Sequence, residues 1–212
     1  MKAKRIVSLL LVMFLLFPTV LLEGAHAETI ALRAPIAPHG RWINGARPNY
    51  IVHSDFGAQT MADFNSAMAT WNNRLGFTKI TRNPTTRHSR SFTGRSDGIN
   101  SVYRVQWGTG PNIPVAFAEV FYLGTTGGQR RIVEVDIGFN MSYGFHNNSS
   151  PGSSNFDVWT VMAHEAGHVL GLSDHRVSRD AVMFAQIDPA ERRRQPTALD
   201  VMHLDVLNYR AS

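Results

Sequence analysis

A stretch of twelve residues from His164 to His175, HEAGHVLGLSDH, constrains this chain more strongly than any other part of its sequence. His164 and His168 are four residues apart, so on a helix they lie about 40° apart on one face, one turn above the other. Two imidazoles placed in this way can both reach one Zn²⁺ at roughly 2.0–2.1 Å. Glu165 points off the metal axis, where a carboxylate can take a proton from zinc-bound water. The stretch therefore predicts a metal site with its own base.

The residues that follow His168 distinguish this metal site from a plain amphipathic helix with two exposed histidines. Gly171 permits the left-handed turn that ends a helix, and Asp174 stands three residues further on as a possible third ligand. Met183 lies in Ala181-Val182-Met183-Phe184, which is a candidate Met-turn. Helix, glycine, ligand and methionine in this order favour the metal site.

The pattern resembles the metzincin zinc peptidases, and the order of elements matches that group over almost the whole chain after the first 41 residues. The resemblance implies that His164 and His168 bind zinc, that Glu165 is the general base and that Met183 lies beneath the metal. It also implies hydrolysis of peptide bonds by zinc-activated water, in which Glu165 takes the proton and passes it to the leaving amine.

The third metal ligand is either Asp174 or His175. Matrixins, the metzincins that this chain otherwise resembles, have histidine at the position of Asp174, whereas the order Leu-Ser-Asp-His is similar to snapalysin-type peptidases, which use aspartate. His175 would fit if the loop carried one extra residue, and imidazole is the commoner zinc ligand. Asp174 is preferred because the helix and Gly171 fix its offset. Phe184 replaces the tyrosine that is common after the Met-turn, so no fifth protein ligand is expected.

The first 27 residues are predicted to be a secretory signal peptide. Its parts are the basic residues Lys2, Lys4 and Arg5, the apolar run 6–22 and the cleavage motif Ala25-His26-Ala27. The alternative is a retained membrane anchor, but the apolar run is shorter than the ~20 residues that span a bilayer, and Pro18 interrupts it. We therefore expect a secreted, extracellular protein with no membrane anchor after cleavage.

Removal of the signal leaves 185 residues (212 minus 27), enough for one domain with a substantial core. We expect an extended lead-in at 28–48, rich in proline and glycine, and a zinc metallopeptidase catalytic domain at 49–212. The chain has no cysteine, so its core must suffice without disulfides. The propeptide cysteine that keeps many matrix metallopeptidases latent is therefore absent as well.

The charge distribution does not suggest a nucleic-acid partner. The formal charge of +5 falls to +3 on cleavage, because the signal carries three Lys or Arg residues and one Glu. The run Arg192-Arg193-Arg194 and the Ser/Arg-rich residues 85–97 are expected to be solvated loops. We expect a monomer whose partners are protein or peptide substrates.

Hydrophobic periodicity predicts one long helix followed by several strands. The helix spans Gln59 to Leu75, where apolar residues recur every three or four positions, and Gly76 ends it. Strands are expected near 77–81, 101–107, 115–122 and 131–139, with a turn-rich linker at 124–128. By its resemblance to the family, Val115 to Val120 is expected to be the edge strand that pairs with substrate.

Capping signals place the last two helices. The metal-bearing helix is expected to start at Ser154 or Asn155, with Asp157 completing a capping box. The last helix is expected to be capped by Thr197, with Asp200 at its third position. The fold class is therefore α+β of the metzincin type: a twisted mixed sheet, a long backing helix, an active-site helix, a Met-turn and a C-terminal helix.

These observations favour a secreted zinc metalloendopeptidase. The alternative is a catalytically inactive, zinc-stabilised secreted binding protein of the same fold, although Glu165 would then have no role. Structural Ca²⁺ is common in relatives, but no dense acidic loop in this sequence demands it. The specificity pocket is expected to be shaped by the loop around residues 184–196.

Overall fold

The computed structural model describes residues 40–42, 46–147 and 154–206. The expected signal peptide 1–27 and the lead-in before residue 40 lie outside these ranges. None of the helices in the described ranges combines the length and the apolar character needed to cross a bilayer.

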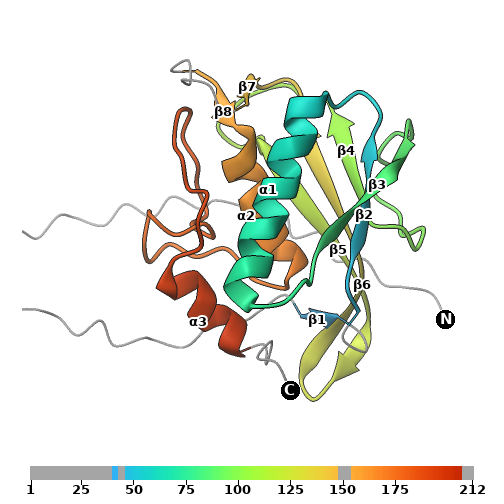
Figure 1. Cartoon of the computed structure of the whole chain (residues 1–212), viewed down its shortest axis with the longest axis vertical. Helices are drawn as coiled ribbons and strands as arrows, with labels where there is room; N and C mark the ends of the chain where they lie inside the picture. The colour runs from blue at the N-terminus through green and yellow to red at the C-terminus, as the bar shows by residue number, and fades with distance from the viewer. Residues whose placement is uncertain (1–39, 43–45, 148–153, 207–212) are drawn as a thin grey trace, which may run out of the picture.

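Six strands form one twisted sheet in which β6 has three partners (Figure 1). The strands are β1 (Arg41–Trp42), β2 (Asn49–His53), β3 (Thr81–His88), β4 (Ser101–Val105), β5 (Ala116–Thr126) and β6 (Gln129–Asn140). β1 and β4 pair in parallel with successive parts of β6, and β2 pairs in parallel with both β4 and β3. β5 runs antiparallel to β6 and, among the described strands, pairs with no other. The sheet is therefore mixed, as expected, with β5 at one edge.

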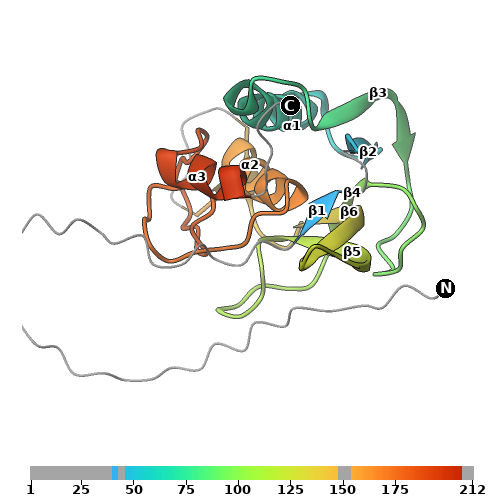
Figure 2. The same cartoon turned by 90° about the horizontal axis from the view of Figure 1, so that it is seen from below.

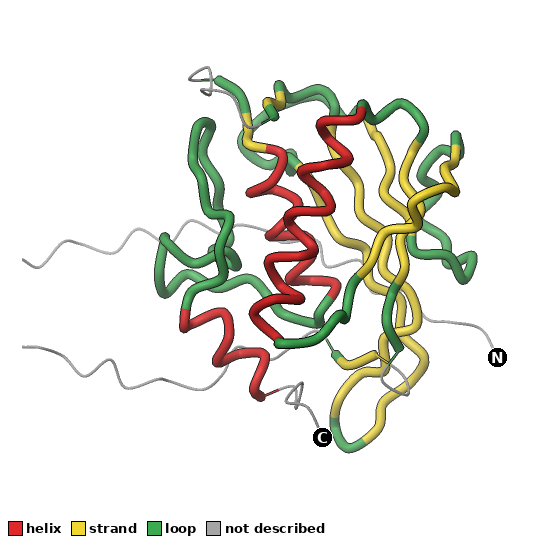
Figure 3. The backbone as a smooth tube through the Cα atoms, viewed as in Figure 1, coloured by secondary structure: helices red, strands yellow, loops and turns green. Residues whose placement is uncertain are grey.

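Three helices lie to one side of this sheet, as the view from below shows (Figure 2). They are α1 (Ala58–Leu75), α2 (Val158–Val169) and α3 (Ala198–Val206), and the short parallel pair β7 (Phe145–His146) and β8 (Phe156–Asp157) leads into α2. α1 and α2 lie side by side, and α3 lies on the far side of α2 from the sheet (Figures 1 and 2). The long connection from α2 to α3 is drawn as loop throughout (Figure 3).

The predicted stripe of α1 faces the core. Met61, Phe64, Met68 and Trp71 are buried, and the helix ends at Gly76 in the left-handed region with φ of 77°. A glycine adopts this conformation without the steric cost that a Cβ would impose. The boundaries match the prediction to within one residue.

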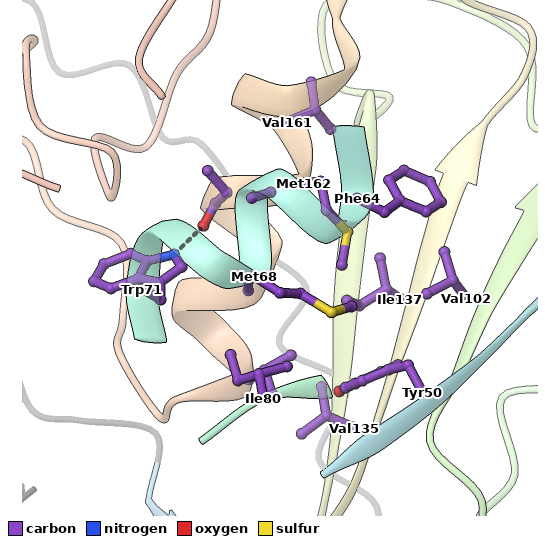
Figure 4. Close-up of a cluster of buried hydrophobic side chains, with 14 of the residues drawn as sticks. Tyr50, Phe64, Met68, Trp71, Ile80, Val102, Val135, Ile137, Val161 and Met162 are labelled. Carbon is purple, nitrogen blue, oxygen red and sulfur yellow. Dashed lines mark hydrogen bonds between the residues drawn. The ribbon is translucent and has the colours of Figure 1, made fainter. Parts of the chain in front are cut away.

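α1 and α2 pack against each other and against the sheet through one continuous cluster of buried side chains (Figure 4). Full burial of a large apolar side chain contributes about 1.5–3 kcal/mol, so this cluster dominates the stability of the domain. Two tryptophans also fix α2 by hydrogen bonds: the Trp71 Nε1 donates to the Ala163 carbonyl at 2.7 Å, and the Trp42 Nε1 donates to the Val169 carbonyl at 2.6 Å. The middle and the end of α2 are thus held by side chains from α1 and β1.

Two element boundaries differ from the sequence prediction. Residues 77–80 are not in a strand, and β3 instead runs from Thr81 to His88, into a segment expected to be a loop. Most side chains of β3 are exposed or half-buried, so backbone pairing with β2 defines this strand and no apolar alternation marks it. The hairpin of β5 and β6 also continues through the expected linker to a turn at Gly127 and Gly128.

The start of α2 was also misplaced. The helix begins at Val158, and Asp157 is its N-cap, whose side chain accepts a hydrogen bond from the Thr160 backbone N–H. Asp157 was expected three residues inside the helix. The mistake arises because Ser154 and Asp157 are both good capping residues, and sequence alone does not show which one caps.

Candidate metal centre

α2 presents two imidazoles whose outer nitrogens face the same point. The Nδ1 atom of His164 lies 2.8 Å from the Val182 carbonyl, and the Nδ1 atom of His168 lies 2.9 Å from the Leu172 carbonyl. A carbonyl only accepts, so each Nδ1 carries the proton in the neutral ring and each Nε2 keeps its lone pair. The backbone thus prepares both rings to bind a cation through Nε2.

A glycine turn then brings a carboxylate to the same point. Gly171 has a φ of 92°, and the chain reverses there just after α2 ends. The Oδ1 atom of Asp174 comes within 3.0 Å of the His164 Nε2 and 3.3 Å of the His168 Nε2. One ligand atom from each of these three residues lies within 4.8 Å of the other two, and no other described residues form such a group.

The donor set fits zinc. Imidazole nitrogen and carboxylate oxygen are ligand types that Zn²⁺ accepts, and three protein ligands leave a fourth position open, as in catalytic zinc sites. The Asp174 Oδ1 atom is buried and accepts no hydrogen bond of good geometry in the described part of the chain, although two ring nitrogens face it. This is the arrangement expected when both kinds of atom are directed at a shared cation.

The charges of the cluster reinforce each other. Burial disfavours charge on His168, but the Asp174 carboxylate, whose Oδ1 atom lies 3.3 Å from the His168 Nε2, outweighs burial and raises the pKa of His168 to about 9. Burial also acts to raise the pKa of Asp174, but His164 and His168 outweigh it and hold that pKa far below its usual range. The Asp174 carboxylate therefore stays ionised and attracts positive charge to the point between the rings.

His175, the alternative ligand, lies elsewhere. Its ring is buried, with the Nε2 atom 3.8 Å from the Oδ1 atom of Asp200. Its backbone N–H donates to the Met183 carbonyl, and its carbonyl accepts from the Ala185 N–H. The structure thus groups Asp174 with the two histidines of α2 and places His175 beside α3.

Glu165 lies against the cluster on the same helix. It is 5% exposed, and its Oε2 atom is buried with no hydrogen-bond partner among the described residues. Burial raises the pKa of Glu165, although His164 and His168 oppose the shift. An unpartnered buried carboxylate oxygen costs free energy, so its retention here indicates a chemical task.

The Met-turn packs against α2 beside the cluster. Met183 is fully buried, and a Cβ placed on Gly167 would lie only 2.1 Å from its sulfur, so only glycine allows this approach. The Asp200 carboxylate accepts hydrogen bonds from the Val182 and Met183 N–H groups at 3.1 and 3.0 Å. It also accepts from the Thr197 N–H and hydroxyl, which confirms the predicted cap of α3. One carboxylate thus joins the Met-turn to α3, a second role that the sequence did not indicate.

A cavity of about 530 Å³ opens beside His164 and Glu165. One wall comes from the segment 110–116, which leads into β5, the second from α2, and the third from residues 184–189 with Arg193. The third wall falls within the loop that was expected to shape the specificity pocket.

Two arginines of the run 192–194 were misjudged from sequence as solvated. Arg193 is buried, and its guanidinium donates to the carbonyls of Ala181, Phe184 and Gln186. Arg194 forms two hydrogen bonds to the Asp157 carboxylate, at 2.8 and 2.6 Å. Only Arg192 of the three is exposed. Nothing in a run of three identical residues tells which one is buried.

Comparison with known proteins assigns the family. The chain is similar to high choriolytic enzyme 1, a hatching enzyme zinc-protease from Oryzias latipes (medaka fish), with 15% sequence identity and a TM-score of 0.43. That match covers 81% of this chain and 95% of the medaka chain. None of the curated proteins compared with the chain matches it. The sequence model of the Matrixin family matches residues 53–207, which include both helix histidines, the Met-turn and most of the sheet. The chain therefore belongs to the matrixin family of zinc metallopeptidases and has a metzincin-type fold.

Proposed function

We propose that this protein is a secreted zinc endopeptidase in which His164, His168 and Asp174 hold the metal and Glu165 is the general base. The observation that carries the proposal is the convergence of two Nε2 atoms and one carboxylate oxygen beside the buried, unpartnered Oε2 atom of Glu165. A zinc site that only stabilised the fold would not need the carboxylate of Glu165 beside the metal.

Zinc bound here would supply a Lewis acid that polarises the scissile carbonyl and activates water. The residues of the chain orient the ligands and transfer the proton. The carbonyls of Val182 and Leu172 keep the two rings in the ligating tautomer. Glu165 accepts the proton of the attacking water at Oε2 and delivers it to the leaving amine.

The substrate is a protein or peptide in an extended conformation. β5 lies at a sheet edge, and residues just before it and at its start line the cavity, so a peptide can pair with this edge and pass Glu165. The cavity beside Glu165 then takes a substrate side chain next to the bond that is cut.

Substitution of Glu165 by Gln tests the proposal. The Glu165→Gln variant should bind zinc and unfold like the wild type but hydrolyse casein about 10²–10⁴-fold more slowly, because a general base is lost. Zinc content, thermal unfolding and casein hydrolysis are measured on both proteins. A wild type that binds zinc and cleaves nothing would instead support the inactive binding protein, and near-native hydrolysis by the variant would remove Glu165 from the mechanism. Export is tested by N-terminal sequencing of protein from the culture medium, which should begin near Glu28.

A further inference from the structure

The third wall of the cavity is built around one buried guanidinium, that of Arg193. The Nη1 atom of Arg193 donates to the Ala181 carbonyl at 3.1 Å and to the Phe184 carbonyl at 3.3 Å, and Nη2 donates to the Gln186 carbonyl. The guanidinium carbon also lies 5.8 Å from the centre of the Phe184 ring. One side chain thus gathers three carbonyls from the Met-turn and from the residues that follow it.

The backbone of Arg193 ties this wall to α2. Its N–H donates to the Thr160 hydroxyl oxygen at 3.0 Å, and the same hydroxyl donates to the Asp157 N-cap at 2.6 Å. Thr160, Phe184, Gln186 and Arg193 all line the cavity that opens beside Glu165. Arg193 therefore connects the wall of the cavity with the helix that carries the candidate metal ligands.

The third wall contains no helix or strand whose own hydrogen bonds would hold it in place without Arg193. Residues 185–197 contain no helix or strand. Between Phe184 and Arg193, the backbone hydrogen bonds that reach distant described segments are those of the Ala185 N–H to the His175 carbonyl and of the Ala190 N–H to the Asn155 carbonyl. A buried charged group that satisfies three carbonyls cannot be removed without leaving those carbonyls short of partners. The position of the wall must then change. The metal donors lie on other segments, and Asp200 still holds Val182, whose carbonyl orients His164.

We propose that Arg193 is a positioning residue that determines specificity: it fixes the wall of the cavity and so selects the substrate side chain accepted beside the scissile bond. This inference rests on the proposed peptidase function. A fitted pocket discriminates between side chains by about 10–200-fold, and a wall that moves loses this discrimination. Peptides that place no side chain in the cavity gain nothing from the wall, so their cleavage should depend little on Arg193.

Three variants separate this role from general damage. Arg193→Met keeps the apolar stem and removes the donors, Arg193→Lys keeps a charge with fewer donors, and Arg192→Met changes the exposed neighbour as a matched control. Two peptide series, which differ only in the residue before or only in the residue after the scissile bond, are cleaved by each protein. For Arg193→Met, kcat/KM should fall about tenfold or more for the preferred side chain and less than about twofold for glycine. The kcat/KM values of Arg193→Lys should lie between those of Arg193→Met and the wild type, and the values of Arg192→Met should equal those of the wild type.

Hydrogen–deuterium exchange gives a readout that does not depend on activity. Exchange of amides in residues 184–193 should be faster in Arg193→Met than in Arg192→Met, while α1 stays equally protected in both. The proposal is overturned if kcat/KM of Arg193→Met falls equally for all peptides, or if its exchange pattern is identical to that of Arg192→Met. If the wild type cleaves no peptide, the peptidase function and the specificity role fail together, and the exchange data still decide whether Arg193 holds the wall.

Discussion

At the scale of single residues, the neighbours Asp174 and His175 have opposite surroundings. His175 pairs through its backbone with the Met-turn, so the chain is extended there and adjacent side chains point to opposite sides. The side chain of Asp174 reaches the rings of α2, and the ring of His175 approaches Asp200. The choice between the two ligands therefore depends on the pairing of His175 with Phe184, nine residues further along the chain and outside the local motif.

Separate alanine substitutions test this assignment. Asp174→Ala should lose most of its zinc while keeping its fold, because a ligand is removed from a half-buried surface position. His175→Ala should keep its zinc but unfold at a lower temperature, because it leaves a cavity in a buried site next to Asp200. Zinc content and thermal unfolding are measured on both. Loss of zinc by His175→Ala with retention by Asp174→Ala would reverse the assignment.

At the scale of elements, α2 is held at its N-terminus by a partner far along the chain. Asp157 is fully buried, and burial alone would raise the pKa of its carboxyl. Arg194 and Thr160 donate hydrogen bonds that outweigh burial and lower this pKa below its usual value. The carboxylate thus stabilises the fold above the unfolded pKa of about 4, and the stabilisation is lost as pH falls through the lower folded pKa.

Arg194→Met should expose this dependence. It leaves the buried Asp157 charge without its guanidinium, at a cost of about 2 kcal/mol, less than the 3–5 typical of fully buried pairs because Arg194 is partly exposed. The pKa of Asp157 rises, so acid unfolding should begin at a higher pH than in the wild type. Arg179→Met is the control. Arg179 also pairs with carboxylates, but solvent screens these pairs, so its loss should change the free energy of unfolding little. Urea unfolding between pH 3 and 7 measures the stability of both variants. Equal losses of unfolding free energy in the two variants would contradict this account of Asp157.

The elements that could be predicted from sequence are those whose determinants are close together in the chain. The α1 stripe repeats every three or four residues. The cap of α3 joins Thr197 to Asp200, which is only three positions away. The two histidines of α2 share a face by their spacing alone. β3 was misplaced because it is defined by pairing with β2, and Arg194 was misjudged because its partner Asp157 is 37 residues away.

At the scale of the whole molecule, the sheet buries acidic groups as well as an apolar core. Asp136 of β6 is 1% exposed, and its Oδ1 atom accepts the Ser101 N–H at 2.9 Å. Burial is the main cause that raises the pKa of Asp136 to about 8, and the charge of nearby Glu134 adds to it. The folded chain therefore holds a proton between about pH 4 and 8 that the unfolded chain releases, so this group makes folding less favourable as pH rises through that range.

Asp136→Asn should remove this pH dependence. The amide oxygen can still accept the Ser101 N–H, and the side chain cannot ionise. The free energy of unfolding of the variant should exceed that of the wild type by an amount that grows with pH, at up to about 1.4 kcal/mol per unit, and levels off above about pH 8. Urea unfolding at pH 5, 7 and 9 measures the difference. Parallel pH profiles would mean that Asp136 titrates alike in the folded and unfolded chains.

Anomalous diffraction at the zinc absorption edge, from crystals of the purified protein, tests most directly that His164, His168 and Asp174 form a catalytic zinc site. The predicted result is one peak at roughly 2.0–2.1 Å from the Nε2 atoms of both histidines and roughly 2.0–2.2 Å from a carboxylate oxygen of Asp174, with a fourth position open. A peak beside His175, a fourth protein ligand or the absence of zinc from this cluster would contradict the account.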